Sequence, residues 1–162
     1  MKSTVYLIVT SVVLVFGCFS CASTTPTDDT DSLIYLKVKS TQQAGKDSIA
    51  YLSTDFVWYN ASTKELKFNN PPTCQKFQSF GQVKFYLGAD SLFTAKIVTD
   101  AMSSIANDLV FHFKSDGKIY LEDGYPISQG DSTLRAQNKE KRAASWNRFV
   151  IKMKKDKHYV EN

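Results

Sequence analysis

Apolar residues alternate with polar ones along most of the segment from residue 32 to residue 121. Ile34, Leu36 and Val38 set the pattern, with Tyr35 and Lys37 between them. A period of two is typical of a β-strand that buries one face and exposes the other. The pattern recurs in segments 48–52, 55–60, 64–68, 83–87, 91–98, 109–113 and 119–121. We therefore expect about six to seven short strands.

Short polar segments between these runs predict turns. Residues 61–63 separate two strand segments as in a hairpin, and residues 88–90 and 115–118 each combine Gly with Asp. Residues 69–81, with Pro71 and Pro72, predict an irregular connection, and residues 99–108 predict a loop or a single helical turn. Hairpin spacing favours an antiparallel sheet with one solvent-exposed face. We find no repeat and no pattern typical of a parallel crossover.

A C-terminal helix of residues 131–156 is predicted from its cap and its periodicity. Gly130, Asp131 and Ser132 supply residues that favour a helix N-terminus. Apolar residues then follow at helical spacing on one stripe: Ala143, Trp146, Phe149, Val150 and Met153. Such a stripe packs onto the apolar face of a sheet. Since 162 residues suit one domain, we expect a single α+β domain over residues 32–162, with the helix on one face of an antiparallel sheet.

The N-terminal segment 1–20 has the features of a secretory signal peptide. Lys2 precedes an apolar run over residues 5–16, and small residues follow that run. The run is shorter than the roughly 20 residues that a membrane-spanning helix needs, and no basic cluster follows it. These features favour export over the alternative, a permanent membrane anchor.

Cys21 follows the small residue Ser20 at the end of this leader and predicts lipidation. Fatty acyl chains such as palmitate would then replace the leader as the anchor. Cys18 is a weaker candidate because bulky Phe16 lies close before it, and plain secretion is the alternative. Residues 22–31 contain no large apolar side chain, so segment 21–31 predicts a lipidated cysteine and a flexible tether. Cys74 then remains as a thiol of the mature chain, and we expect it to be structural.

The leader ending in Phe19, Ser20 and Cys21 resembles the leaders of lipoproteins of the Bacteroidota. Four blocks farther along the chain, at residues 92–95, 107–110, 118–126 and 141–146, are similar to small lipoproteins of the same group. The resemblance implies an outer-membrane lipoprotein that faces either the periplasm or the cell surface. It carries over no activity, cofactor or functional residue.

Positive charge is concentrated in the C-terminal segment. Residues 131–162 hold nine basic and four acidic side chains, whereas residues 21–130 hold ten basic and twelve acidic ones. The side of the predicted helix opposite its apolar stripe carries the candidate partner-binding residues Lys141, Arg148, Lys152 and Lys155. A basic amphipathic helix can contact an anionic membrane or an acidic partner; the alternative is a solvated face that keeps the domain soluble. Because the leader exports the chain, nucleic acid is not an expected partner.

Few side chains suit catalysis near neutral pH. His112 and His158 belong to no recognisable motif; we expect His112 to be partly exposed on its strand and His158 to lie in a fraying tail. Four carboxylates at strand ends are candidates for convergence: Asp100, Asp108, Glu122 and Asp123. Two of them together would hold a calcium ion or form an acid and base pair, but turns attract Asp for local reasons. We therefore predict no catalytic residue, no metal site and no cofactor.

Several functions are compatible with these features. Five aromatic residues are candidates for stacking a sugar or a peptide, although core packing explains most of them; they are Trp58, Tyr59, Tyr86, Tyr120 and Tyr125. The leading hypothesis is a lipid-anchored lipoprotein of the cell envelope with a non-enzymatic binding or accessory role toward a protein or glycan. The second is an envelope hydrolase that uses His112 or the pair Glu122 and Asp123. The third is a structural module whose basic helix contacts the membrane or a partner.

Overall fold

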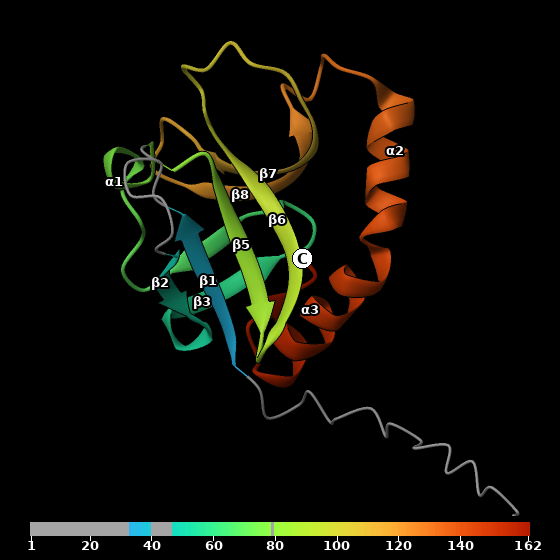
Figure 1. The fold of residues 1–162 in the computed structure, drawn as a ribbon. Helices are drawn as coiled ribbons and strands as arrows, with labels where there is room; N and C mark the ends of the chain where they lie inside the picture. The colour runs from blue at the N-terminus through green and yellow to red at the C-terminus, as the bar shows by residue number, and fades with distance from the viewer. Residues whose placement is uncertain (1–32, 40–46, 79) are drawn as a thin grey trace, which may run out of the picture.

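The computed structural model describes residues 33–39, 47–78 and 80–162 (Figure 1). The predicted signal peptide, Cys21 and the tether up to residue 31 lie outside the described residues. Within the described part of the chain, no helix has both the length and the apolar character needed to cross a membrane.

A six-stranded sheet forms the centre of the domain. Its strands follow the order β2-β1-β5-β6-β7-β8 across the sheet. They are β1 (Ile34–Lys39), β2 (Asp47–Leu52), β5 (Gln82–Leu87), β6 (Asp90–Thr99), β7 (Ala106–Phe113) and β8 (Ile119–Tyr125). The segments with period-two alternation thus become strands. The predicted α+β class with a mainly antiparallel sheet is confirmed.

One neighbouring pair in this sheet is parallel, so the expectation of no parallel crossover is wrong. β6 and β7 run in the same direction, with Lys96 opposite Val110 and Thr99 opposite Phe113. The short segment 100–105 connects the two strands. Alternation shows which face of a strand is buried but not the direction of the strand. The sequence pattern therefore does not distinguish this connection from a hairpin.

A second, smaller sheet has the strand order β4-β3-β9. Its strands are β3 (Phe56–Asn60), β4 (Leu66–Phe68) and β9 (Tyr159–Val160). β3 and β4 form the hairpin predicted around residues 61–63. β9 pairs with β3 in parallel, and the backbone oxygen of His158 accepts a hydrogen bond from the Tyr59 N–H at 2.7 Å. The expectation of a fraying tail around His158 is therefore wrong.

Two short helical segments lie in the connections. η2 (Ser53–Asp55) precedes β3, and α1 (Cys74–Gln78) interrupts the connection that was predicted over residues 69–81. The ring of Phe77 in α1 is buried, with its centroid 6.0 Å from that of Phe111 and 5.6 Å from that of Phe113. Cys74 packs, partly buried, against the same core.

The C-terminal segment forms two helices instead of the one predicted, α2 (Ser132–Lys141) and α3 (Ala143–Lys155). Asp131 caps α2, and its side chain accepts hydrogen bonds from the backbone N–H groups of Thr133 and Leu134. The helices meet at Arg142, where φ of −95° and ψ of 1° depart from α-helical values. Helical periodicity continues past this residue, which is why the pattern does not reveal the break.

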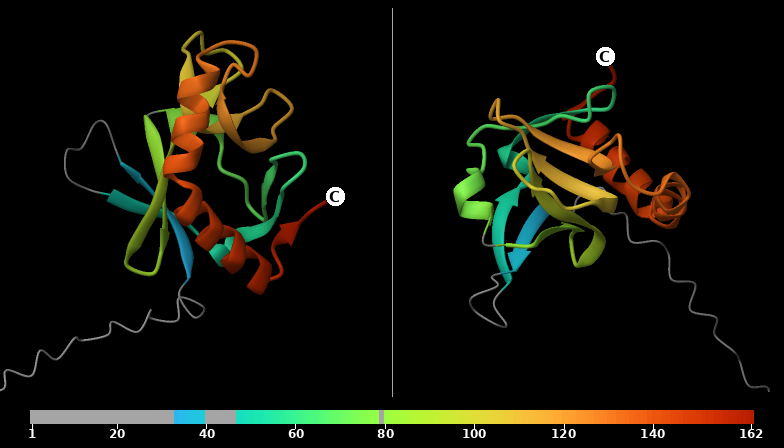
Figure 2. Two further views of the ribbon diagram at one scale, coloured as in Figure 1. Left: turned by 90° about the vertical axis from the view of Figure 1, so that its right-hand side faces the viewer. Right: turned by 90° about the horizontal axis from the view of Figure 1, so that it is seen from above.

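α3 packs onto one face of the large sheet, as predicted. Phe149 is fully buried, and its ring centroid lies 5.9 Å from that of Phe85 and 5.5 Å from that of Phe93. Trp146 also contacts Phe93, at a centroid distance of 5.3 Å. In Figure 2, α2 and α3 follow each other along the sheet, with the small sheet beside α3.

The opposite face of the sheet is covered at one end, so the expectation of a fully solvent-exposed face is wrong there. Val98, Ala106, Val110 and Tyr125 form a separate buried cluster across β6, β7 and β8. The ring of His112 lies against this cluster, 4.8 Å from the ring of Tyr125. His112 thus occupies an enclosed position on the face that the alternation predicts to be polar.

Candidate functional site

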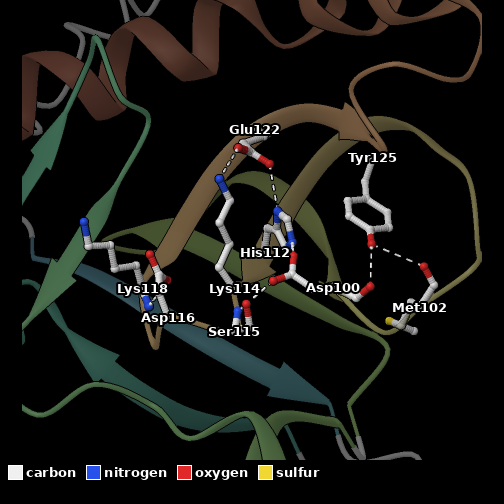
Figure 3. Close-up of polar contacts among 9 residues, drawn as sticks. All are labelled: Asp100, Met102, His112, Lys114, Ser115, Asp116, Lys118, Glu122 and Tyr125. Carbon is white, nitrogen blue, oxygen red and sulfur yellow. Dashed lines mark hydrogen bonds and ion pairs between the residues drawn. The ribbon is translucent and has the colours of Figure 1, made fainter.

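His112 lies at the centre of a polar cluster at the covered end of the sheet (Figure 3). Its Nδ1 lies 2.9 Å from Glu122 Oε2, and its Nε2 lies 2.8 Å from Asp100 Oδ1. His112 is 5% exposed, so the expectation of a partly exposed histidine is wrong. The residues that enclose His112 come from a loop and a neighbouring strand. The alternation within β7 gives no information about them.

Three strands contribute to this cluster. Asp100 directly follows β6, and its Oδ2 accepts a hydrogen bond from the Ser115 N–H at 2.7 Å. Glu122 lies on β8, with its Oε1 3.7 Å from Lys114 Nζ. The hydroxyl of Tyr125 donates to the backbone oxygen of Asp100 at 3.3 Å. The cluster therefore joins the end of β6 to β7 and β8.

The two carboxylates determine the charge of the His112 ring. Ionised carboxylate oxygens only accept hydrogen bonds, so the ring makes both bonds when both its nitrogens carry protons. Burial is the largest influence and lowers the pKa of His112, but the hydrogen bonds and charges of Glu122 and Asp100 outweigh it and raise the pKa. The Ser115 N–H is the largest cause of a lowered pKa at Asp100; burial opposes it, and His112 lowers the pKa further.

This arrangement suits a structural role better than proton transfer. A general base needs a ring nitrogen that can take a proton from a substrate, and both nitrogens of His112 face carboxylates. Glu122 and Asp123 are successive residues of β8, so their side chains point to opposite faces of the sheet. Glu122 contacts His112, whereas Asp123 accepts a hydrogen bond from Arg142 on the helix side.

The four carboxylates predicted at strand ends fall into two groups, and only Asp100 lies just beyond a strand, since the other three lie within β7 and β8. Asp100 and Glu122 hold His112, while Asp108 and Asp123 both accept hydrogen bonds from Arg142. In the part of the chain that the structure describes, no three His, Cys, Asp or Glu side chains are grouped to hold a metal ion. The carboxylates that were candidates for a calcium site or an acid and base pair are thus hydrogen-bonded to His112 or Arg142.

A groove of about 330 Å³ lies where α2 and α3 meet β8 and the β3–β4 turn. Tyr59 and Trp146 form its aromatic part, and their rings meet edge to face at 5.7 Å and 80°. Leu121 and Val150 add apolar surface. The polar side chains that line the groove are Lys64, Asp123, Lys139, Arg142 and Asn147. The groove thus combines an aromatic wall with several hydrogen-bonding groups.

Asp123 is the carboxylate that lines this groove, and it contacts two cationic side chains. Arg142, whose side chain is 10% exposed, bonds to both Asp108 and Asp123. Lys139 Nζ lies 3.4 Å from the other carboxylate oxygen of Asp123. Asp123 therefore has two cationic partners, and Lys64 adds a further positive charge to the lining.

Lys64 closes the β3–β4 turn in a conformation that side chains rarely adopt. Its φ of 67° lies in the left-handed region. Asn60 fixes the turn, since its Oδ1 accepts hydrogen bonds from the backbone N–H groups of Ser62 and Thr63, each at 2.9 Å. The Lys64 backbone oxygen accepts from the Leu121 N–H at 2.9 Å. The turn is thereby held against β8, at the groove.

The sequence pattern does not reveal this groove. It assigns Trp146 to the apolar stripe of the helix, where the residue is indeed partly buried. Lys64, Arg142 and Asn147 belong to no motif. The signal that was present is the tryptophan itself, because a large aromatic residue at the edge of a stripe and among basic residues is seldom completely covered.

Lys152 does not lie on the exposed side of the C-terminal helix, contrary to expectation. It is 6% exposed, and its Nζ lies 2.8 Å from Asp156 Oδ1. Residues three apart share one side of a helix. Lys152 therefore follows Phe149 toward the core, with its stem buried and its charge compensated.

The other candidate partner-binding residues belong to two helices, Lys141 to α2 and both Arg148 and Lys155 to α3. Arg148 Nη2 bonds to Asp90 Oδ2 at 2.9 Å and so links α3 to the start of β6. Lys141 and Lys155 are exposed near the C-terminal ends of α2 and α3. Because Lys152 is buried, the four basic residues do not all lie at the surface.

The aromatic candidates also lie apart. Tyr59 and Tyr125 are buried. Tyr86 stacks on a neighbouring tyrosine across β1 and β5. Lysine ammonium groups lie over the rings of Trp58 and Tyr120, at 5.8 and 3.9 Å from the ring centroids. These residues form no common platform.

Comparisons of this chain with protein-family models, curated proteins and solved structures found no match. Any statement about its function therefore depends on its own residues.

Proposed function

We propose that the chain is a lipid-anchored lipoprotein of the cell envelope whose domain binds a glycan in the groove beside Trp146. The leader and Cys21 support the anchor. The groove supports the binding role, because it places an aromatic ring among hydrogen-bonding side chains. The C–H faces of sugars pack against such rings, and sugar hydroxyls bond to amide, carboxylate and guanidinium groups.

The size of the groove favours a glycan over a protein partner. At about 330 Å³ it falls at the small end of the range of small-molecule sites. A stable protein interface buries about 800 Å² on each partner. One or two sugar rings match the groove better than a protein surface does.

Two side chains of the groove are already held in place by contacts within the domain. Trp146 is held by ring contacts with Tyr59, Phe93 and Phe149 at centroid distances of 5.7, 5.3 and 5.3 Å. Arg142 is held by its carboxylate partners on β7 and β8. Side chains that are already ordered lose little conformational entropy when a ligand binds. This preorganisation supports a binding role.

The hydrolase alternative receives less support from the geometry. Glycoside hydrolysis ordinarily uses two carboxylates that flank the scissile bond, and the residues that line the groove include one, Asp123. His112 is not among these residues, and both of its nitrogens are occupied. We therefore propose binding without cleavage.

Binding is tested with the full chain in detergent micelles against an array of oligosaccharides, followed by calorimetry with those retained. Asn147→Ala, at an exposed position on α3, should weaken binding about tenfold through the loss of a hydrogen bond to the sugar. Asn70→Ala, at an exposed position outside the groove, should leave affinity unchanged. An array on which no glycan is retained, or equal effects of the two variants, would refute glycan binding in this groove.

The anchor is tested separately by metabolic labelling with a fatty acid. We expect label on the wild-type chain and on Cys74→Ala, and none on Cys21→Ala, which should leave the membrane fraction. An N-terminus without lipid, or equal labelling of the Cys21 variant, would refute the anchor.

A further inference from the structure

We infer that the groove selects acidic glycans and binds the carboxylate of a uronic acid residue through its cationic side chains. This inference rests on the proposed glycan binding and specifies the class of sugar. It follows from three features of the groove: its charges, the position of Lys64, and the apolar wall of Trp146 and Val150, on which a sugar ring can pack.

The groove carries an excess of positive charge. Lys64, Lys139 and Arg142 line it together with one carboxylate, that of Asp123. Asp123 contacts both Arg142 and Lys139. Arg142 has a second carboxylate partner in Asp108, which does not line this groove. A ligand within the groove therefore meets more cations than anions, and a neutral sugar would leave that excess unused.

Lys64 is the cation best placed to meet a ligand charge. Its side chain is exposed, and its ammonium donates to the Ala61 backbone oxygen instead of to a carboxylate. The Asn60 turn and the Leu121 N–H hold its backbone in place. A ligand carboxylate can thus form an ion pair with Lys64 without breaking an existing one.

The apolar wall determines what kind of anion fits. Trp146 and Val150 project from α3, while Lys64 comes from the β3–β4 turn and Arg142 from the junction of the helices. A ligand that uses both kinds of surface needs a ring to pack on the indole and an acid group beside that ring. A uronic acid residue has this shape, since its carboxylate is attached directly to the sugar ring. A free inorganic anion can contact the cationic side chains but has no ring to pack on the indole.

The experiment compares a galacturonate trisaccharide with the uncharged galactose trisaccharide by calorimetry on the full chain in micelles. We expect the acidic sugar to bind at least about tenfold more tightly at low salt, with the difference shrinking at high salt. Lys64→Gln should weaken binding of the acidic sugar about tenfold and leave the neutral sugar unaffected. Lys96→Gln, at an exposed position on β6 outside the groove, removes the same charge and should change neither affinity.

The outcomes separate this inference from the proposed function. Equal affinities for the two trisaccharides overturn the selection for acid and leave glycan binding intact. Inorganic phosphate that competes as well as the galacturonate trisaccharide overturns the uronic acid class and indicates an anion site without a sugar requirement. Failure of both trisaccharides, with other glycans still retained on the array, overturns this inference alone. Failure of every glycan overturns both proposals.

Discussion

His112 on β7 and Glu122 on β8 form a buried pair across adjacent strands, with Nδ1 and Oε2 2.9 Å apart. His112 stands opposite Tyr120 in the strand register, so Glu122 is its diagonal neighbour on the same face. Asp100 completes the cluster from the end of β6. These contacts tie together the parallel pair β6–β7 and the edge strand β8.

Replacing His112 should destabilise the fold. His112→Ala leaves Glu122 buried without its imidazolium partner, and such losses cost about 3 kcal/mol. Urea denaturation measures the free energy of unfolding. The double variant His112→Ala/Glu122→Ala should be less destabilised than the sum of the single variants, because the unpaired charge is then absent. Strict additivity would contradict a direct interaction between the two side chains.

The stability of the domain should depend on pH through this cluster. The pKa of His112 is raised from 6.5 in the folded state. Its contribution to the free energy of unfolding is therefore complete below pH 6.5 and is lost as the pH rises through the folded-state pKa. The pKa of Asp100 is lowered from 3.8, so its contribution is present above that pH and is lost as the pH falls through the folded-state pKa. These contributions together should therefore peak between the two ordinary values.

Urea denaturation at about pH 5 and about pH 8.5 checks this dependence. The wild-type chain should be more stable at the lower pH. In His112→Ala the difference should be strongly reduced, since the titrating ring is absent. If the pH dependence of stability is unchanged in this variant, titratable groups other than His112 cause it.

Arg142, at the junction of α2 and α3, and Arg148, within α3, both form ion pairs with the sheet. Arg142 should contribute more to stability because Arg148 is more exposed. Arg142 is largely buried and bridges Asp108 and Asp123, whose side chains are partly exposed, so Arg142→Gln should cost about 1.5–3 kcal/mol. Arg148 pairs at the surface with Asp90, and Arg148→Gln should cost less than about 1 kcal/mol. Hydrogen exchange should show faster opening of α2 in the Arg142 variant. Equal costs would mean that Arg142 does not hold the helices to the sheet.

Gly124 and Gly117 offer a matched pair of substitutions. Both have left-handed backbones, with φ of 100° and 82°. An added Cβ at Gly117 meets nothing within 4 Å, whereas at Gly124 it would lie 2.6 Å from Cζ of Arg135. Gly117→Ala should therefore cost about 1 kcal/mol of backbone strain, and Gly124→Ala should cost about 1–3 kcal/mol more.

Thermal denaturation of the two glycine variants, converted to free energies, measures this difference. The guanidinium of Arg135 donates to the backbone oxygens of Pro126, Ile127 and Gln129 and so organises the loop after β8. A small, equal loss in both variants would show that Arg135 moves aside without cost.

Much of the fold was predictable because its determinants are local. Alternation in β5 and β6 places Val83, Phe85 and Ala95 in the core, and the spacing of Phe149 and Met153 places α3 on the sheet. These patterns depend on which side of an element is buried. They carry no information on strand direction, so they do not predict the parallel pairing of β6 with β7 or of β3 with β9.

The candidate sites were less predictable because their residues come from distant segments. Lys64 and Leu121 are joined by one hydrogen bond across the hairpin and β8, and Arg142 meets carboxylates on two strands. The sequence identified Glu122 and Asp123 as one pair, although consecutive positions in a strand face opposite sides. The charge of Lys152 predicts a solvent-exposed side chain, whereas its position three residues after Phe149 turns it toward the core.

The pairing of β9 with β3 has a consequence for how the chain matures on the ribosome. Tyr59 and Asn60 emerge early, yet their parallel partners Tyr159 and Val160 are about a hundred residues downstream. The hairpin that carries Lys64 therefore gains the strand that completes its sheet only after about a hundred further residues have been synthesised. The groove that this hairpin helps to line can therefore take its final form only after residue 160 has been synthesised.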